Sequence, residues 1–197
     1  MSYSFSPMLY HWFVRPKWFT KKYIHDHITS QFSFDNRSVL DFGCGTGANC
    51  RMSPTASYLG IDPDSRRIGF ASRLFPDYEF RELSTEDLPV DDNSVDYVWI
   101  IAVLHHLPSE LITHYLKEFR RVLKKDGQIL VIEPYLCPKT PISNRFMQLY
   151  DRGQYIREED HYLRLFDENR FSCSIHRKFR KCFLYNELFF SARQTTI

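Results

Sequence analysis

The 197-residue sequence lacks any apolar run as long as the ~18 to 20 residues that a membrane-spanning helix requires. Its first residues, MSYSFSPMLYHWF, have neither the basic start nor the small-residue cleavage pattern of a secretory signal. We therefore expect a cytoplasmic protein without a transmembrane segment.

Cysteine pairs at metal-binding or disulfide spacing are also missing. The five cysteines are odd in number and scattered, and no two are spaced C-x-x-C. This pattern argues against a disulfide framework and against a zinc site, so we expect free thiols and no metal. There is no internal repeat and no low-complexity segment, and the length favours a single domain.

A strong excess of one charge is missing too, since the formal net charge is +2. The charges are nevertheless uneven: residues 35–135 hold 11 basic and 16 acidic side chains, whereas the two flanks together hold 15 and 8. Residues 1–34 are also rich in aromatic rings. These rings either pack onto the core and leave the Lys and Arg stems in water, or help to form a surface for an acidic or amphiphilic substrate.

Short apolar segments bounded by Gly, Pro or Asp alternate with helical stretches. Five of them are predicted to be buried strands, at 38–42, 57–62, 78–83, 95–103 and 127–134. The clearest helix follows Pro108, with Ser109 as its expected cap, Lys124 and Lys125 at its end and Gly127 beyond it. This alternation predicts an α/β protein with a doubly wound, mostly parallel sheet.

The rest of the chain is predicted to complete this one domain. Residues 1–34 are expected to form a helical cap or lid, 35–135 the core, and 136–197 the substrate-side helices and the last two strands. The helices are predicted at 142–151 and near 158–168, and the late strands are predicted to join near Arg180 and Lys181. If they complete the sheet, it has seven strands.

Three glycines fall within five residues in the stretch SVLDFGCGTGANC, residues 38–50. The segment GCGTGA fits the dinucleotide pattern G-x-G-x-x-G/A, with Asp62 about 20 residues on to accept a ribose hydroxyl. Asp41, just before the loop, would repel a pyrophosphate and attract an ammonium group. S-adenosylmethionine has an ammonium group, a ribose and no phosphate, so it fits this loop better than a dinucleotide does.

Four blocks, VLDFGCGTG, YLGIDPD, STEDLPVDDNSVDYVWIIAVLHHLP and FRRVLKKDGQILVIEP, resemble in order and spacing the motifs of class I S-adenosylmethionine-dependent methyltransferases, in the type 11 subgroup. The resemblance runs from about Val39 to Pro134. It implies a Rossmann-like fold with S-adenosylmethionine as cofactor and says little about the methyl acceptor. The residues that it places along the cofactor are Asp41, Gly43, Cys44, Gly45, Gly47, Asp62, Pro63, Ser84, Thr85, Glu86 and Ile101.

Ser84 departs from the pattern of the family, which commonly has an Asp at this position to bind the adenine amino group. Ser84 can still donate or accept a hydrogen bond. Alternatively, the adenine contact falls to the backbone of Thr85 or to Glu86. Glu86 also fits a solvated turn before Pro89.

His105 and His106 follow the fourth predicted strand, at the sheet edge where ligands of such folds bind. One interpretation makes His105, or its neighbour, a general base with a pKa near neutrality. The other makes both histidines polar caps before the next helix, because adjacent side chains cannot both point into one pocket.

The methyl acceptor is expected to contact the flanks. The candidate contacts are Tyr10, Tyr135, Tyr150 and Arg152, and Arg152 and Arg157 are candidates to clamp a carboxylate or a phosphate. A surface arginine paired with Glu158 or Glu159 is the alternative for each.

The sequence thus predicts methyl transfer to a small molecule, with oxygen favoured over nitrogen or carbon, on an acidic, glycan-type or lipid-linked metabolite. Peripheral membrane contact is compatible with the basic, aromatic flanks. The alternatives are methylation of RNA or another nucleic acid, against which the low net charge argues, a non-catalytic S-adenosylmethionine-binding protein, and a dehydrogenase.

Overall fold

The computed structural model describes residues 17–151 and 153–195. Tyr10, much of the expected cap, and Arg152 therefore lie outside the described residues. The chain divides into two compact units, Met1–Thr85 and Glu86–Ile197, which are described separately below.

The first unit contains a three-stranded parallel sheet in the order β3-β2-β1. Its strands are β1 (Val39–Phe42), β2 (Tyr58–Asp62) and β3 (Glu79–Glu82), and β1 is buried along its whole length. Helix α4 (Ser65–Leu74) connects β2 to β3, and the side chain of Asp64 caps it by accepting from the amides of Arg66 and Arg67.

The connection from β1 to β2 departs from the predicted alternation of strands and helices. The connection from β1 to β2 contains only two short 3-10 turns, η3 (Cys50–Met52) and η4 (Thr55–Ser57), and no α-helix. The expected N-terminal helix runs over residues 17–29 as α2 (Lys17–Thr20), a π-helical turn η2 (Lys21–His25) and α3 (Asp26–Thr29). Ile24 and Ile28, four residues apart, are its buried apolar side chains.

The second unit holds strands β4 (Val95–Ile101), β5 (Leu123–Leu136), β8 (Tyr185–Gln194) and β7 (Phe171–Lys181), in that order across its sheet. β4 and β5 are parallel, whereas β8 is antiparallel to β5 and to β7. The two-residue strand β6 (Arg157–Glu158) pairs with the end of β5. The two late strands therefore join the sheet as expected.

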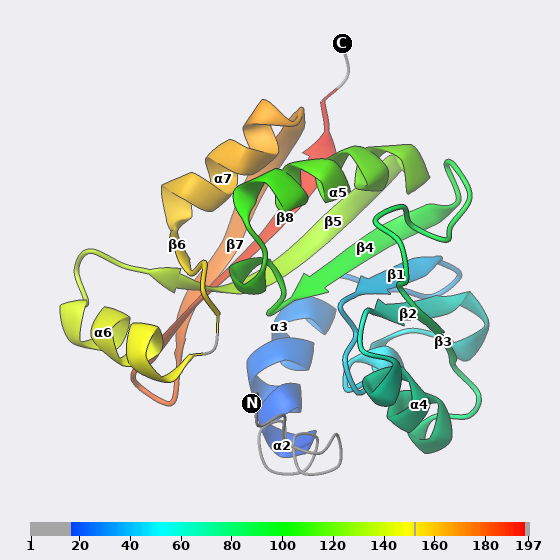
Figure 1. Cartoon of the computed structure of the whole chain (residues 1–197), viewed down its shortest axis with the longest axis horizontal. Helices are drawn as coiled ribbons and strands as arrows, with labels where there is room; N and C mark the ends of the chain where they lie inside the picture. Colours follow the sequence, from blue (N-terminus) through cyan, green and yellow to red (C-terminus); the bar gives the residue numbers. More distant parts are fainter. Residues whose placement is uncertain (1–16, 152, 196–197) are drawn as a thin grey trace. The chain divides into compact units, whose positions relative to one another are not determined.

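Three helices accompany these strands: α5 (Ser109–Val122), α6 (Pro141–Tyr150) and α7 (Glu159–Glu168). Figure 1 shows α5 and α7 alongside one another over the sheet of this unit, with α6 at the far end of β8. Helix α5 buries the side chains of a single stripe, namely Ile112, Tyr115, Leu116, Phe119 and Val122. The predicted mixed α/β fold class is confirmed.

Several boundaries differ from the sequence prediction. Ser109 is the first helical residue of α5 and makes no cap, because Pro108 occupies the capping position. Lys124, Lys125 and Gly127 lie in β5, which begins directly after the helix. The late strands meet at residues 182–184, just beyond Arg180 and Lys181, since the ladder of β7 extends to the pair Lys181 and Tyr185.

Candidate functional site

The glycine loop after β1 has a backbone that only glycine adopts without strain. Gly43, Gly45 and Gly47 have φ angles of 74°, 57° and 74°, in the left-handed region. The amides of Gly43 and Cys44 donate to the carbonyl of Ile61, at 2.8 and 3.0 Å. The loop is therefore fixed against the end of β2.

Asp62 is the link between this loop and the start of α4. Its Oδ2 accepts from the amide of Gly45 and its Oδ1 from the amide of Asp64, both at 2.9 Å. Burial raises the pKa of Asp62, while these two amides and the Arg67 charge oppose the shift. Each carboxylate oxygen has a further lone pair, so Asp62 retains the capacity to accept from a ribose hydroxyl.

Asp41 is buried, with 1% of its surface exposed, and accepts a 2.7 Å hydrogen bond from the hydroxyl of Tyr58. Burial, followed by the nearby Asp41 charge, raises the pKa of Tyr58 well above its ordinary value. The same causes, in that order, raise the pKa of the Cys44 thiol. The sequence did not predict a role for Tyr58, because it is an ordinary strand residue that lies 17 positions from Asp41 in the chain.

Among the residues that the structure describes, those beside Gly45 leave an open space. A Cβ at this position would find Asp62 Oδ2, at 4.0 Å, as its nearest neighbour. Two carboxylates, Asp41 and Asp62, stand at the ends of the strands that carry this loop. This charge suits a ligand with an ammonium group and a ribose, and it repels a phosphate. Pro63, Ser84 and Thr85 are exposed in the same unit, and Glu86 is exposed at the start of the second unit.

In the second unit, the carboxylate of Glu133 organises the turn after β4. Its Oε1 accepts from the amides of Val103 and Leu104, at 2.6 and 2.8 Å, and its Oε2 from the amide of His105 at 3.3 Å. The same Oε2 lies 2.7 Å from Nδ1 of His105. Glu133 is completely buried, and this satisfied set of partners accounts for a carboxylate in the core.

His105 occupies an electrostatically unusual position. Burial by itself lowers the pKa of His105, but the charge and hydrogen bond of Glu133, together with Asp151 and Glu187, outweigh it and raise the pKa above its ordinary value. Because Glu133 holds the proton on Nδ1, the second nitrogen Nε2 is the one that gains or loses a proton. Nε2 lies 3.6 Å from Oδ1 of Asp151.

The two histidines do not share this environment. His105 is buried and His106 is exposed, with their ring centroids 4.0 Å apart. His105 lies against the carboxylates of Glu133 and Asp151. Among residues 17–151 and 153–195, no group of three or more potential ligand side chains is arranged to hold a metal ion.

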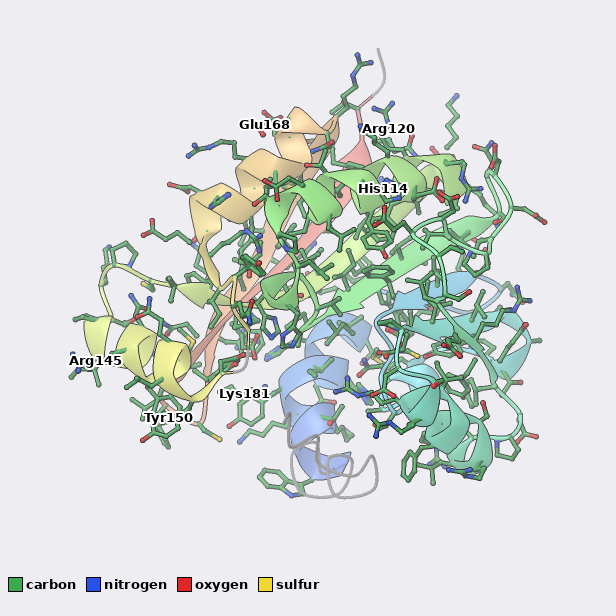
Figure 2. The ribbon with its side chains drawn as sticks, viewed as in Figure 1. His114, Arg120, Arg145, Tyr150, Glu168 and Lys181 are labelled. Carbon is green, nitrogen blue, oxygen red and sulfur yellow. The ribbon has the colours of Figure 1, made fainter. Side chains whose placement is uncertain are left out.

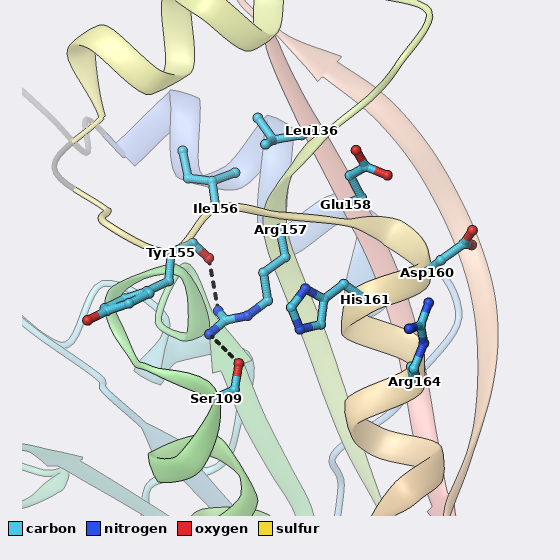
Figure 3. Close-up of a pocket in the computed structure, with 9 residues that line it drawn as sticks. All are labelled: Ser109, Leu136, Tyr155, Ile156, Arg157, Glu158, Asp160, His161 and Arg164. Atoms are coloured by element: carbon cyan, nitrogen blue, oxygen red, sulfur yellow. Dashed lines mark hydrogen bonds between the residues drawn. The ribbon is translucent and has the colours of Figure 1, made fainter.

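Arg157 differs from both sequence-based interpretations, because it is 6% exposed and binds backbone instead of a ligand or Glu158. Its guanidinium donates to the carbonyls of Leu104, Tyr155 and Leu107 and to the hydroxyl of Ser109, at 2.7 to 3.2 Å. Figure 3 shows it between these segments, beside a surface pocket of about 470 Å³. It therefore joins the turn after β4 to β6.

The expected acceptor contacts are spread over different environments. Tyr135 on β5 is 8% exposed, and burial raises its pKa. Tyr150 at the end of α6 is 73% exposed. Ile101, at the end of β4, is buried, and Ala102 follows it with a φ of 58°, a strained backbone for a residue other than glycine.

Glu133 was also missed in the sequence. The signal was present: a charged residue stands within the apolar run ILVIEPY, and a carboxylate at such a position is rarely buried without a partner. Its partner could not be read from the sequence, because His105 lies 28 residues away and the register of β4 against β5 brings the two together.

A family described as a methyltransferase domain matches residues 40–131. A ubiquinone/menaquinone biosynthesis C-methyltransferase of Campylobacter jejuni is 32% identical over 104 residues, which is 48% of this chain and 43% of that protein. The chain thus spans about half the length of the curated relatives it matches.

Solved structures show the same fold. A chain in the complex of the Haloferax volcanii Trm112 methyltransferase activator with a methyltransferase has a TM-score of 0.72 at 17% identity, covering 99% of this chain and 100% of that one. The Streptomyces coelicolor geranyl diphosphate C-methyltransferase, solved with Mg²⁺, geranyl diphosphate and S-adenosyl-L-homocysteine, has a TM-score of 0.69 at 15% identity, covering 92% and 82%.

Proposed function

We propose that this chain, in which residues 40–131 match a methyltransferase domain family, transfers a methyl group from S-adenosylmethionine to a small molecule. The observation that carries this proposal is the glycine loop with its two buried carboxylates, Asp41 and Asp62, and the open space beside Gly45. A loop of this geometry and charge accepts a cationic nucleoside and rejects a dinucleotide.

In this proposal, residues of the first unit bind the ribose and the methionine half of the cofactor. Asp62 accepts from the ribose hydroxyls, while the backbone of Gly43, Cys44, Gly45 and Gly47 lies along the methionine half. Asp41 acts through its negative charge, because its side chain is buried beneath the loop, where its Oδ2 accepts from Tyr58. Pro63, Ser84, Thr85 and Glu86 are assigned to the adenine, and Ile101 to the methyl side.

When bound, S-adenosylmethionine supplies a methyl carbon that is activated by a positively charged sulfur. The protein then has to align the acceptor with that carbon and exclude water, which is mainly proximity and orientation. An acceptor that starts protonated would have to lose a proton during the transfer. We assign this proton to Nε2 of His105, with Glu133 as the positioning residue that holds Nδ1.

Access to Nε2 requires a local movement, because the side chain of His105 is only 4% exposed. Asp151 and Gly153 stand against the imidazole. We infer that Asp151 and Gly153 move aside when the acceptor binds. The competing role for His105 is purely structural, as a fixed cap of the turn after β4.

The acceptor is proposed to be a lipid-linked or otherwise acidic small molecule, with methylation at oxygen or at an acidic carbon. Oxygen is the atom expected from the sequence. The Campylobacter jejuni relative is named a C-methyltransferase, a name that specifies carbon as the methylated atom. The Chlorobaculum parvum relative, 30% identical over 115 residues, is named a demethylmenaquinone methyltransferase. Both kinds of acceptor release a proton, so one imidazole base serves either.

A transfer assay with methyl-labelled S-adenosylmethionine tests the proposal. The acceptors are a short-chain demethylmenaquinone analogue, a set of phenolic and carboxylic acids, and total RNA. We expect labelled product from the quinone-like or acidic compounds, and mass spectrometry then assigns the atom. Labelled RNA alone would support the nucleic-acid alternative, and cofactor binding without any product would support a non-catalytic protein.

We also place the reaction in a reducing compartment such as the cytoplasm. All five cysteines are free, and the buried ones have neighbours that do not include another thiol at bonding distance. Within residues 17–151 and 153–195, none of the helices has the length and apolar character that crossing a bilayer demands.

A further inference from the structure

Helix α6 carries an apolar stripe that faces away from the protein. Ile142, Phe146, Leu149 and Tyr150 recur at helical spacing, and three of them are largely exposed, at 76% for Ile142, 67% for Leu149 and 73% for Tyr150. A surface helix normally turns such a stripe toward the core. Here the buried positions are instead Met147 and the small polar residue Ser143.

The turn between β7 and β8 adds a second exposed apolar group. Phe183 is 88% exposed and Leu184 is 37% exposed. Phe183 has a φ of 64°, and Cys182 before it has a φ of 50°. A bulky side chain in the left-handed region costs stability, and an exposed ring recovers none of that cost by burial. Folding therefore does not explain a phenylalanine at this turn.

These two features lie next to each other. The side chain of Asn186, at the start of β8, donates to the hydroxyl of Thr140, just before α6, at 2.9 Å. Figure 1 shows α6 beside the turn that joins β7 to β8. We call this patch the α6–hairpin surface; it consists of Ile142, Phe146, Leu149, Tyr150, Phe183 and Leu184.

The two segments that carry the α6–hairpin surface have charged side chains of one sign only, although two of their lysines are paired with glutamates of neighbouring segments, Lys178 with Glu159 and Lys181 with Glu187. Residues 137–150 and 174–186 together contain six Lys and Arg residues and no Asp or Glu. The acidic residues that follow these two segments, Asp151 and Glu187, have side chains that are 8% and 4% exposed. Lys139, Arg145 and Arg180 are exposed. Figure 2 shows Arg145 and Tyr150 extending outward from α6.

We propose that the α6–hairpin surface binds the surface of an anionic lipid bilayer. An outward apolar stripe next to basic side chains is the pattern of helices that lie in the membrane interface, and each basic residue near an anionic bilayer adds attraction. The cores of protein–protein interfaces are depleted of charged residues, lysine among them, whereas this surface has Lys and Arg beside its apolar side chains. This inference goes beyond the proposed function, since bilayer binding requires neither cofactor nor acceptor.

Sedimentation with vesicles of phosphatidylcholine, with or without phosphatidylglycerol, tests the proposal in the absence of methyl donor. We expect the full chain to bind the anionic vesicles, with binding that weakens as salt is added. Phe183→Ser should weaken binding about tenfold, because the variant lacks the aromatic ring that the bilayer buries in this proposal. Phe183→Leu, which keeps an apolar side chain, should retain most of it.

The charge is tested by a matched pair of reversals. Arg145→Glu on α6 should weaken binding to anionic vesicles about tenfold at low salt, whereas Lys117→Glu, an exposed lysine on α5, should change it little. Equal binding to both kinds of vesicle, no binding, or equal effects of the two reversals would overturn the proposal. A dimer that Phe183→Ser dissociates, without vesicle binding, would instead identify an interface between copies of the chain.

Discussion

Glu133 accepts the Nδ1 proton of His105 at 2.7 Å and, with its two oxygens, also the backbone amides of residues 103–105. One carboxylate therefore fixes both the turn after β4 and the tautomer of the imidazole. This arrangement leaves Nε2 of His105 as the titrating nitrogen and distinguishes His105 from the exposed His106.

This pairing predicts the pH dependence of methyl transfer to an acceptor that starts protonated. A base must be neutral, and the neighbouring carboxylates raise the pKa of His105 above its ordinary value despite burial. The rate, measured as kcat/KM, should therefore rise with pH through a pKa above ~6.5.

Glu133→Gln should move this limb of the profile to lower pH and reduce the rate, because it removes the main carboxylate that supports the imidazolium. His105→Gln should abolish the limb. Near wild-type turnover of His105→Gln on the true acceptor would assign His105 a structural role only.

The same shift predicts how stability depends on pH. A histidine whose pKa is raised in the folded state contributes stability that is complete below its unfolded value of ~6.5 and is lost as pH rises through the folded pKa. Urea unfolding at several pH values should show this loss in wild type and a flatter curve in His105→Gln. If the free energy of unfolding depends on pH in the same way in wild type and in His105→Gln, the ion pair of His105 with Glu133 contributes nothing to stability.

Gly153 offers a steric test of how closely its backbone packs on the imidazole of His105. A Cβ at Gly153 would overlap the ring of His105 and lie 2.9 Å from its carbonyl oxygen. Gly153→Ala should lower the free energy of unfolding by ~1 to 3 kcal/mol through overpacking.

The matched control is Gly69→Ala in α4, where the described residues outside the helix's own backbone and the two chain neighbours place no atom within 4 Å of the new Cβ. This variant should be neutral or stabilising by ~0.5 to 1 kcal/mol, as expected for alanine in a helix. Chemical denaturation measures both, and equal effects of the two substitutions would contradict the packing described around His105.

Arg157 is expected to matter for stability and not for cofactor affinity. Arg157→Met leaves three carbonyls and one hydroxyl without their donor and should cost ~2 to 4 kcal/mol. Arg157→Lys keeps the charge but lacks the forked set of N–H donors, so its free energy of unfolding should lie between those of wild type and Arg157→Met. The exposed Arg164→Met serves as control. A stable Arg157→Met that loses affinity for the substrate would restore the ligand-clamp interpretation.

The strands and the glycine loop could be predicted from the sequence because their signals are local. β1, β2 and β4 are short apolar runs with clear boundaries, and the three glycines mark a backbone that needs positive φ. The end of α5 was misplaced because Lys124 and Lys125 fit a helix end as well as the first residues of a strand.

The site is harder to predict, because its contacts join residues far apart in the chain. Tyr58 reaches Asp41 only through the register of β1 against β2, and Arg157 reaches Leu104 across 53 positions. From the sequence alone, a basic residue between two helices, such as Arg157, is therefore interpreted as a ligand clamp until its buried carbonyl partners are known. Polar residues inside apolar runs, such as Glu133, are the local signal that such contacts exist.

The most direct test of the central claim is calorimetric titration of the wild-type chain and of Asp62→Asn with S-adenosylmethionine, S-adenosylhomocysteine and NADH. Asp77→Asn, an exposed carboxylate of the same unit, is the control. We predict that wild type and the control bind the two sulfur compounds and not NADH, and that Asp62→Asn binds them at least ~10-fold more weakly. Binding of NADH alone, or unchanged affinity in Asp62→Asn, would contradict the assignment of the glycine loop and Asp62 to the methyl donor.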